Sequence, residues 1–360
     1  AIVNVTKWLA VWGNYAQTFN PIDANFPNMD FSLAQPAVSK GRDFGIRLNL
    51  GDGRIVANLS RYIAKEENVS FRVQQQSINT MINANVVGDN STDGMNRRGI
   101  SLIPTTDYYN TRDYEASGYE LELVGNFTRS WRVTFNAALA KAKQTNAYRE
   151  IISYWRSNES VFRQILADAG VAINASNVAT LSVPGSPDGT NSANAWNTFQ
   201  SFLLNIVSGP QDVNRLTRYT ANFFTDYRFS TGKMKGLRTG FGIQYRGPQV
   251  IGYRGADTVV DPSNAARAID NPNVDAYTTV DAKAYYLGTA TLGYAVKFFG
   301  QSVDLNLSVS NLFNYRGVQY INTTLRPPNG NVLDPSRVAT PNGFSTLAPR
   351  GFKLAARYAF

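Results

Sequence analysis

The sequence predicts an all-β protein, an antiparallel up-and-down transmembrane β-barrel whose long external loops contain short helices. Three observations support this fold class. Apolar and polar residues alternate with a period of two in about ten segments. The links between these segments alternate between a few residues and roughly twenty to seventy residues. The last segment has one wholly apolar face and finishes on an aromatic residue, as a barrel-closing strand does.

The alternation runs along the chain in ten predicted strands. They cover residues 5–19, 41–50, 55–60, 119–123, 131–139, 218–229, 237–246, 277–298, 303–310 and 352–360. The phase of the first strand is unclear, because Trp8 and Trp12 fall on one face and Leu9 and Val11 on the other. A tight turn at Gly51-Asp52-Gly53 separates the second strand from the third. Short turns and long links in regular alternation favour a membrane barrel over a soluble sandwich.

Successive side chains of a strand point to opposite faces, so each predicted strand has a lipid phase and an interior phase. The lipid phase is predicted to include Leu121, Val133, Phe223, Phe241, Val296, Leu305 and Leu354. The interior phase is predicted to include Glu120, Arg228, Asn306, Lys353 and Arg357. In the candidate barrel-closing strand, the lipid phase consists of Phe352, Leu354, Ala356, Tyr358 and Phe360. Aromatic residues beside the short turns or at the end are predicted to form a periplasmic girdle: Trp131, Phe229, Phe298, Tyr358 and Phe360.

Two segments within one long external link have a helical rather than a strand pattern. Residues 148–169 and 194–207 carry apolar residues at helical spacing, and Gly170 follows the first as a C-cap. The two helices could pack on each other as a loop subdomain, or they could form a contact surface for a ligand or a partner.

Composition excludes several classes of function. The 360 residues include neither histidine nor cysteine, which removes Ser-His-Asp and Cys-His catalysis, disulfides and soft metal ligands. An enzyme is therefore not expected, and no cofactor is expected. The net charge is +9, but the basic residues are scattered, so no nucleic-acid partner is predicted. No apolar run approaches the roughly 18 residues of a membrane-spanning helix.

Four segments together resemble the β-barrel of TonB-dependent outer-membrane receptors. They are Trp12 to Pro21, Gly41 to Arg54, Ser310 to Tyr315 and Pro349 to Phe360, and they occur in the order of the family. Asn311, Leu312 and Phe313 are similar to the family's segment at the end of the penultimate strand. The resemblance implies that residues 1–360 form the C-terminal portion of a 22-stranded barrel, namely its last ten strands. The plug domain and the earlier strands would lie outside this chain.

The same resemblance implies a location in the outer membrane of a Gram-negative-type bacterium and import of a scarce nutrient with energy from the TonB system. Siderophores, vitamins and oligosaccharides are the implied substrate classes. The alternative is a passive outer-membrane porin, which would lack a plug. The implied partners are the lipid bilayer, the TonB complex through the missing plug, the outer-membrane assembly machinery and a small-molecule ligand.

The long external links, residues 66–114 and 144–214, are the candidate ligand-contact region, because binding residues concentrate on loops held by a rigid scaffold. Their candidate contact residues are Tyr108, Tyr109, Trp155 and Trp196, whose flat rings could stack on sugars or aromatic chelators. Without histidine or cysteine, a metal is expected to arrive already chelated.

Overall fold

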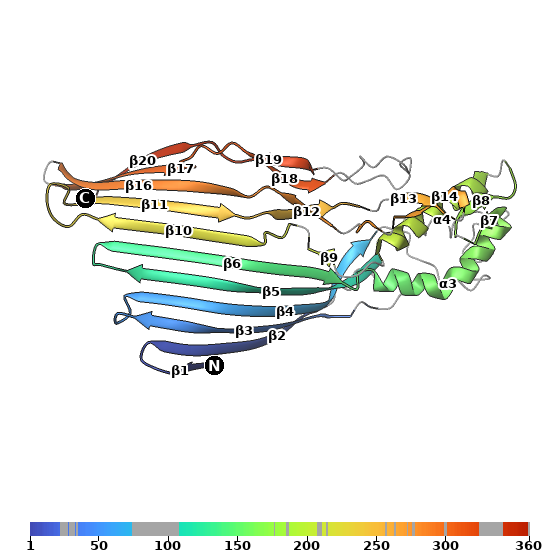
Figure 1. Ribbon diagram of the computed structural model, residues 1–360, viewed down its shortest axis with the longest axis horizontal. Helices are drawn as coiled ribbons and strands as arrows, with labels where there is room; N and C mark the ends of the chain where they lie inside the picture. The colour runs from blue at the N-terminus through green and yellow to red at the C-terminus, as the bar shows by residue number, and fades with distance from the viewer. Residues whose placement is uncertain are drawn as a thin grey trace.

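A computed structural model describes the chain except for residues 22–27, 29–32, 34, 74–107, 176, 185–186, 207–210, 214, 256–257, 263, 272, 276–277, 299–300, 324–340 and 359–360. Figure 1 shows one large antiparallel sheet, with a small helical unit beyond one of its ends. The short turns lie at the opposite end of the sheet from this unit. This arrangement matches the predicted sorting of short and long links.

The main sheet has a linear strand order, β1-β2-β3-β4-β5-β6-β10-β11-β16-β17-β20. The bounds are β1 (Ile2–Asn4), β2 (Leu9–Asn20), β3 (Ala37–Leu50), β4 (Ile55–Val73), β5 (Tyr108–Asn126), β6 (Trp131–Thr145), β10 (Tyr219–Arg228), β11 (Leu237–Arg246), β16 (Tyr285–Phe298), β17 (Gln301–Ser310) and β20 (Gly351–Tyr358). The short strand β9 (Gln211–Asp212) also pairs with β6. Within the described residues, β1 and β20 are the two ends of this path and do not pair with each other.

The other elements belong to the long links. They are α3 (Arg149–Asp168), β7 (Val171–Ile173), β8 (Ala179–Leu181), α4 (Pro187–Ile206), β12 (Gln249–Tyr253), β13 (Thr258–Asp261), β14 (Asn264–Asp270), β15 (Thr279–Ala282), β18 (Val318–Thr323) and β19 (Pro341–Thr346). The last six form three small hairpin-like sheets, in which β12 pairs with β15, β13 with β14 and β18 with β19.

Register confirms the two predicted faces. Paired residues on neighbouring antiparallel strands share a face. One continuous row joins Leu59 of β4, Leu121 of β5 and Ala137 of β6. The adjacent row on the other face joins Asn58, Glu122 and Asn136. The apolar face is the lipid face and the polar face is the lumen face.

Glycines on the lumen face make room for aromatic rings on neighbouring strands. A Cβ atom placed on Gly118 would lie 2.6 Å from ring atoms of Tyr62, and one on Gly45 would lie 3.0 Å from the ring of Trp12. The rings can approach the wall this closely because these positions lack a side chain. This contact also places Trp12 on the lumen face, which settles the phase that the sequence left unclear.

Two predicted strands are broken in the structure. The first, residues 5–19, contains a turn at residues 5–8, where Thr6 Oγ1 accepts hydrogen bonds from the amides of Trp8 (3.2 Å) and Leu9 (3.0 Å). This turn folds β1 back onto β2. The eighth, residues 277–298, divides into β15 and β16, because β15 leaves the main sheet to pair with β12. Apolar and polar residues alternate on both sides of each break, so the alternation alone could not reveal where the strands end.

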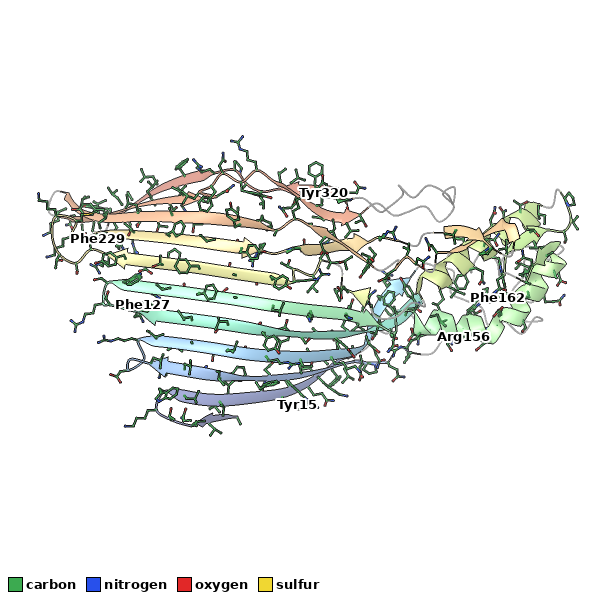
Figure 2. All side chains as sticks on the ribbon, in the orientation of Figure 1. Tyr15, Phe127, Arg156, Phe162, Phe229 and Tyr320 are labelled. Atoms are coloured by element: carbon green, nitrogen blue, oxygen red, sulfur yellow. The ribbon has the colours of Figure 1, made fainter. Side chains whose placement is uncertain are left out.

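The ends of the sheet agree with the predicted aromatic girdle. Trp131 begins β6 directly after a short turn, and Phe229 directly follows β10. Figure 2 shows Phe127 and Phe229 at the short-turn end of the sheet, and the rings of Phe127 and Trp131 lie 5.1 Å apart. Phe360 lies outside the described residues. No helix in the described part of the chain is both long and apolar enough to cross a membrane.

Candidate functional site

The helical unit beyond the sheet, residues 149–206, has its own hydrophobic core and is called the loop unit here. Helices α3 and α4 and the β7–β8 hairpin enclose Trp155, Phe162, Trp196 and Phe199, all of which are buried. The ring of Trp155 lies 4.4 Å from that of Phe199 and 5.1 Å from that of Trp196. Figure 2 shows Phe162 among the helices and Arg156 on α3. The loop unit is therefore a packed element and not an open loop.

Hydrogen bonds hold the hairpin onto this core. Trp196 Nε1 donates to the carbonyl oxygen of Asn177 at 2.7 Å. The side chain of Asn197 bonds to both backbone groups of Ala179, at 2.8 and 3.0 Å. Gly170 ends α3 with a φ of +76°, as predicted for a C-cap, and its amide bonds to the carbonyl of Ala167 at 3.0 Å.

Burial also affects an ionisable group of the loop unit. Desolvation raises the pKa of Tyr154 to about 12, because burial penalises the charged phenolate. Tyr154 is therefore neutral throughout the physiological pH range.

The loop unit is joined to the barrel wall at Asp113 of β5. The Asp113 carboxylate accepts hydrogen bonds from the Asn68 amide (3.0 Å), Asn146 Nδ2 (2.7 Å) and Arg149 Nη2 (3.2 Å). Asp113 is only 5% exposed, so these donors replace the water that its charge would otherwise require. We call these four residues the Asp113 junction.

Three residues at or beside this junction have left-handed backbones: Asn68 (φ 60°), Asn146 (φ 51°) and Tyr148 (φ 64°). Asparagine tolerates this conformation better than most residues, whereas tyrosine does not. The register of β4 and β5 also shifts between Glu66 and Val69. The chain therefore bends sharply where β4, the end of β6 and the start of α3 meet.

The first turn of α3 adds a second set of bonds to β5. Glu150 accepts hydrogen bonds from the amide of Thr111 (2.7 Å) and from its hydroxyl (2.6 Å). Asn110 Oδ1 accepts from the amide of Ile151 at 3.0 Å. Free amides at a helix start need acceptors, and an acidic residue there suits the helix dipole. These contacts orient α3 relative to the wall.

A separate cluster fixes the return of the chain into β10. Arg218 forms ion pairs with Asp281 (2.9 Å) and Asp212 (3.1 Å), and it donates to Thr279 Oγ1 at 3.1 Å. The hydroxyl of Tyr253 donates to the carbonyl oxygen of Asp212. Arg218 therefore links β9 and β15 beside the first residue of β10.

The segment Asn311-Leu312-Phe313, which resembles the family motif, forms a turn directly after β17. Asn311 is buried with a φ of 47°. Its Nδ2 donates to the carbonyls of Tyr315 (2.8 Å) and Ala348 (2.9 Å), and its Oδ1 accepts from the amide of Tyr315 (2.8 Å). The amide of Leu312 donates to the carbonyl of Gly288, and the Phe313 ring packs against Tyr286 at 5.7 Å. The motif thus joins the end of β17 to the segment before β20.

The terminal strand β20 pairs with β17 and has the predicted phase. Leu354 pairs with Leu307, and Ala356 pairs with Leu305, on the lipid face. Phe352 and Leu354 are 70% and 75% exposed, which places large apolar side chains outward.

The candidate ligand-contact aromatics have different locations. Trp155 and Trp196 are 3% and 0% exposed, so their role is in the core of the loop unit and direct stacking on a ligand does not fit their burial. Tyr109 is also buried, at 6% exposure. Tyr108 pairs with Val73 in the sheet, and its side chain lies outside the described residues. Residues 66–73 and 108–114 of the expected loop are in fact extensions of β4 and β5.

The Asp113 junction and the Arg218 cluster are not predictable from the local sequence. The only available signal was the presence of Asn and Asp at strand ends, where polar residues are also common in ordinary turns. Asp113 and Asn68 are 45 positions apart. No local pattern could connect them.

The comparisons with known proteins identify the family. The fold defines the chain as part of an outer-membrane β-barrel. A family described as "TonB dependent receptor-like, beta-barrel" matches residues 1–312, and the chain belongs to this family. No curated protein matches the chain.

Solved structures show the same fold. The pyoverdine receptor FpvA of Pseudomonas aeruginosa bound to pyoverdine matches with a TM-score of 0.54 and 14% identity, over 100% of this chain and 35% of that one. The siderophore receptor PiuA of Acinetobacter baumannii matches with a TM-score of 0.50 and 14% identity, over 99% and 34%. The ferric preacinetobactin receptor BauA of the same species matches with a TM-score of 0.51 and 12% identity, over 99% and 35%. The chain spans about a third of the length of these structures.

Proposed function

We propose that this protein is a receptor that imports a scarce nutrient across the outer membrane with energy from the TonB system. The observation that carries this proposal is the loop unit. It is a packed element with its own core, and the Asp113 junction holds it at the end of the barrel wall, where a ligand can contact it. Family membership supports the TonB-driven mechanism. The printed descriptions of FpvA, PiuA and BauA support a ferric siderophore as the substrate class, which agrees with a metal that arrives already chelated.

We also propose that the chain is the C-terminal portion of the barrel. An open sheet edge in lipid leaves backbone amides and carbonyls without partners, at a cost of several kcal/mol each. The linear strand order, in which β1 and β20 are the two ends of the path within the described residues, supports further strands that close the wall between them. Such strands, together with a plug, would account for the remaining length of the related structures.

The recognition role is tested by removing the loop unit from the full-length receptor. Gln144 of β6 pairs directly with Gln211 of β9, so the strands that flank the deletion are already paired. Residues 148–207 can therefore be replaced by a few glycine and serine residues. The variant should keep its heat-resistant mobility on a gel but lose TonB-dependent uptake of its ferric siderophore.

A milder variant serves as the control. Replacing Asn174–Asn177, between β7 and β8, by Gly-Gly shortens the loop unit and removes the hydrogen bonds that Asn177 accepts from Trp196 and Arg163, but it leaves the contacts of α3 with β5 unchanged. Unchanged uptake by the complete deletion variant would contradict the recognition role. Uptake that persists without TonB would contradict the energised mechanism and favour a passive porin.

A further inference from the structure

The lipid face carries an uneven distribution of charge. The outward positions of β10, β11, β16, β17 and β20 contain no charged residue within the described part of the chain. By contrast, the outward positions of β3, β4 and β6 carry six exposed basic residues: Lys40, Arg42, Arg61, Lys65, Lys141 and Lys143. We call these six residues the basic patch.

Register shows that the basic patch is contiguous. Lys40 pairs with Lys65, which pairs with Glu115, which pairs with Lys143. The next row toward the short turns runs through Arg42, Ile63, Ser117 and Lys141. One row further, Phe44 pairs with Arg61. The patch therefore covers neighbouring strands of one side of the barrel.

The acidic residues beside the patch neutralise only part of it. Glu67 pairs with Lys40 (3.7 Å) and Lys65 (3.4 Å), and Glu115 pairs with Lys65 (3.6 Å). Within the described residues, Arg42, Arg61, Lys141 and Lys143 form no ion pair. The patch keeps an excess of positive charge that an anionic partner can balance.

The height of the patch indicates which partner this is. Lys141 lies ten residues along β6 from Trp131, the girdle residue at the short-turn end. At about 3.4 Å per residue and a tilt of 35–45°, this distance corresponds to about 26 Å of height. The apolar band of an outer-membrane barrel is about 25 Å tall. Lys40 lies ten residues from Leu50, the last residue of β3, and Lys65 lies ten residues from Ile55, the first residue of β4, so both are equally far from the short turn. The patch is thus level with the outer lipid headgroups.

Aromatic rings stack against the guanidinium groups of the two arginines in the patch. The guanidinium of Arg42 lies over the ring of Tyr15 at 6.0 Å, and that of Arg61 lies over Tyr119 at 5.5 Å. Tyr15 and Tyr119 are 56% and 47% exposed, as interfacial aromatics are. Arg61 is deeper than the other five residues, so its long side chain must extend toward the headgroups. A stacked guanidinium retains free N–H groups for the oxygens of a phosphate.

We propose that the basic patch binds the phosphates of a phosphorylated glycolipid in the outer leaflet of the outer membrane. The lysines supply point charges, and the two arginines supply directed donors. Among the described strands, the lipid faces of β10, β11, β16, β17 and β20 carry no charge, so this binding is confined to the part formed by β3–β6. This part of the wall holds the glycolipid tightly, and the strands from β10 to β20 make ordinary apolar contacts with lipid.

The test measures lipid retention by the full-length receptor. The patch variant is Lys40→Gln, Arg42→Gln, Lys141→Gln and Lys143→Gln. The matched control removes the same charge from the lumen face, by Arg228→Gln, Arg246→Gln, Lys353→Gln and Arg357→Gln. Each protein is placed in nanodiscs that contain bis-phosphorylated lipid A, its dephosphorylated form or phosphatidylglycerol, and the lipid retained after washing is measured by mass spectrometry.

The native receptor and the control should retain bis-phosphorylated lipid A, and the patch variant should retain about tenfold less. The dephosphorylated form should be retained weakly by all three proteins. Equal retention by native and patch variants would overturn the proposal, and so would equal loss in the lumen control. If the native receptor retains phosphatidylglycerol and lipid A equally, the patch does not select a glycolipid and this part of the proposal is wrong. Heat-resistant mobility on a gel checks that each variant has folded.

Discussion

A charge introduced on the lipid face tests the assignment of the two faces most directly. Leu305 lies on this face in β17, where it pairs with Tyr294 of β16 and Ala356 of β20. Leu305→Arg would place a guanidinium among these apolar neighbours. Asn306 is the adjacent residue on the lumen face, where it pairs with Gly293 and Ala355. Asn306→Arg is therefore a control at nearly the same depth.

The expected cost follows from the depth of Leu305. It lies four residues beyond Gln301, the first residue of β17. At about 3.4 Å per residue and a tilt of 35–45°, its height above the short-turn end is about 10 Å. This is close to the middle of an apolar band of about 25 Å, where an arginine costs roughly 2–4 kcal/mol. On the water-facing side, the same side chain should change stability by less than about 1 kcal/mol.

Unfolding by denaturant measures this difference. The full-length receptor is reconstituted in phospholipid vesicles and titrated with urea, and the fraction of compact, heat-resistant protein is scored on a gel. The midpoint and slope give the change in the free energy of unfolding. Leu305→Arg should lower this free energy by about 2–4 kcal/mol, and Asn306→Arg should leave it nearly unchanged. If Asn306→Arg is the more damaging substitution, the faces are assigned the wrong way round.

Three further predictions concern the loop unit. Asp113→Ala removes the acceptor of four hydrogen bonds and should weaken the junction by roughly 2–3 kcal/mol. The expected sign is faster proteolysis within residues 149–206, and an unchanged rate would contradict the anchoring role. Trp196→Ala should destabilise the loop unit by roughly 3–5 kcal/mol while the barrel stays heat-resistant, and equal loss of both would show that they unfold together. The pKa of Tyr154 is raised to about 12, so the stability of the loop unit should be constant below pH 10 and fall by roughly 2–3 kcal/mol as the pH rises toward 12. Tryptophan fluorescence measures this fall, and Tyr154→Phe should remove it.

Local patterns predicted most of the wall. Period-two alternation located strands on both sides of each short turn, and it assigned residues such as Leu121 and Glu120 to the correct faces, because each strand side chain is exposed to either lipid or water. The same signal overextended the eighth strand across residues 283–284 and missed the turn at residues 5–8. Alternation describes the environment of side chains and not the partner of a strand.

The candidate contact residues could not be evaluated from the sequence. An aromatic residue in a long polar link has the same local pattern whether it faces a ligand or a small core. Burial decided this for Trp155 and Trp196, since α4 begins at Pro187, earlier than the predicted start, and the two helices enclose both rings. Packing also decides the role of a polar residue such as Asp113, which lies in a predicted link and accepts hydrogen bonds from residues distant in the sequence.

The sequence by itself determined the class of fold, the faces of the strands and the resemblance to the family, because these depend on local periodicity and short motifs. The tertiary structure alone decided how the loop unit is anchored and where charge collects on the outer wall. Both features join residues that are distant in the chain, such as Asn68 with Asp113 and Lys40 with Lys143. Only strand register brings such residues to one place, and register is a property of the assembled sheet.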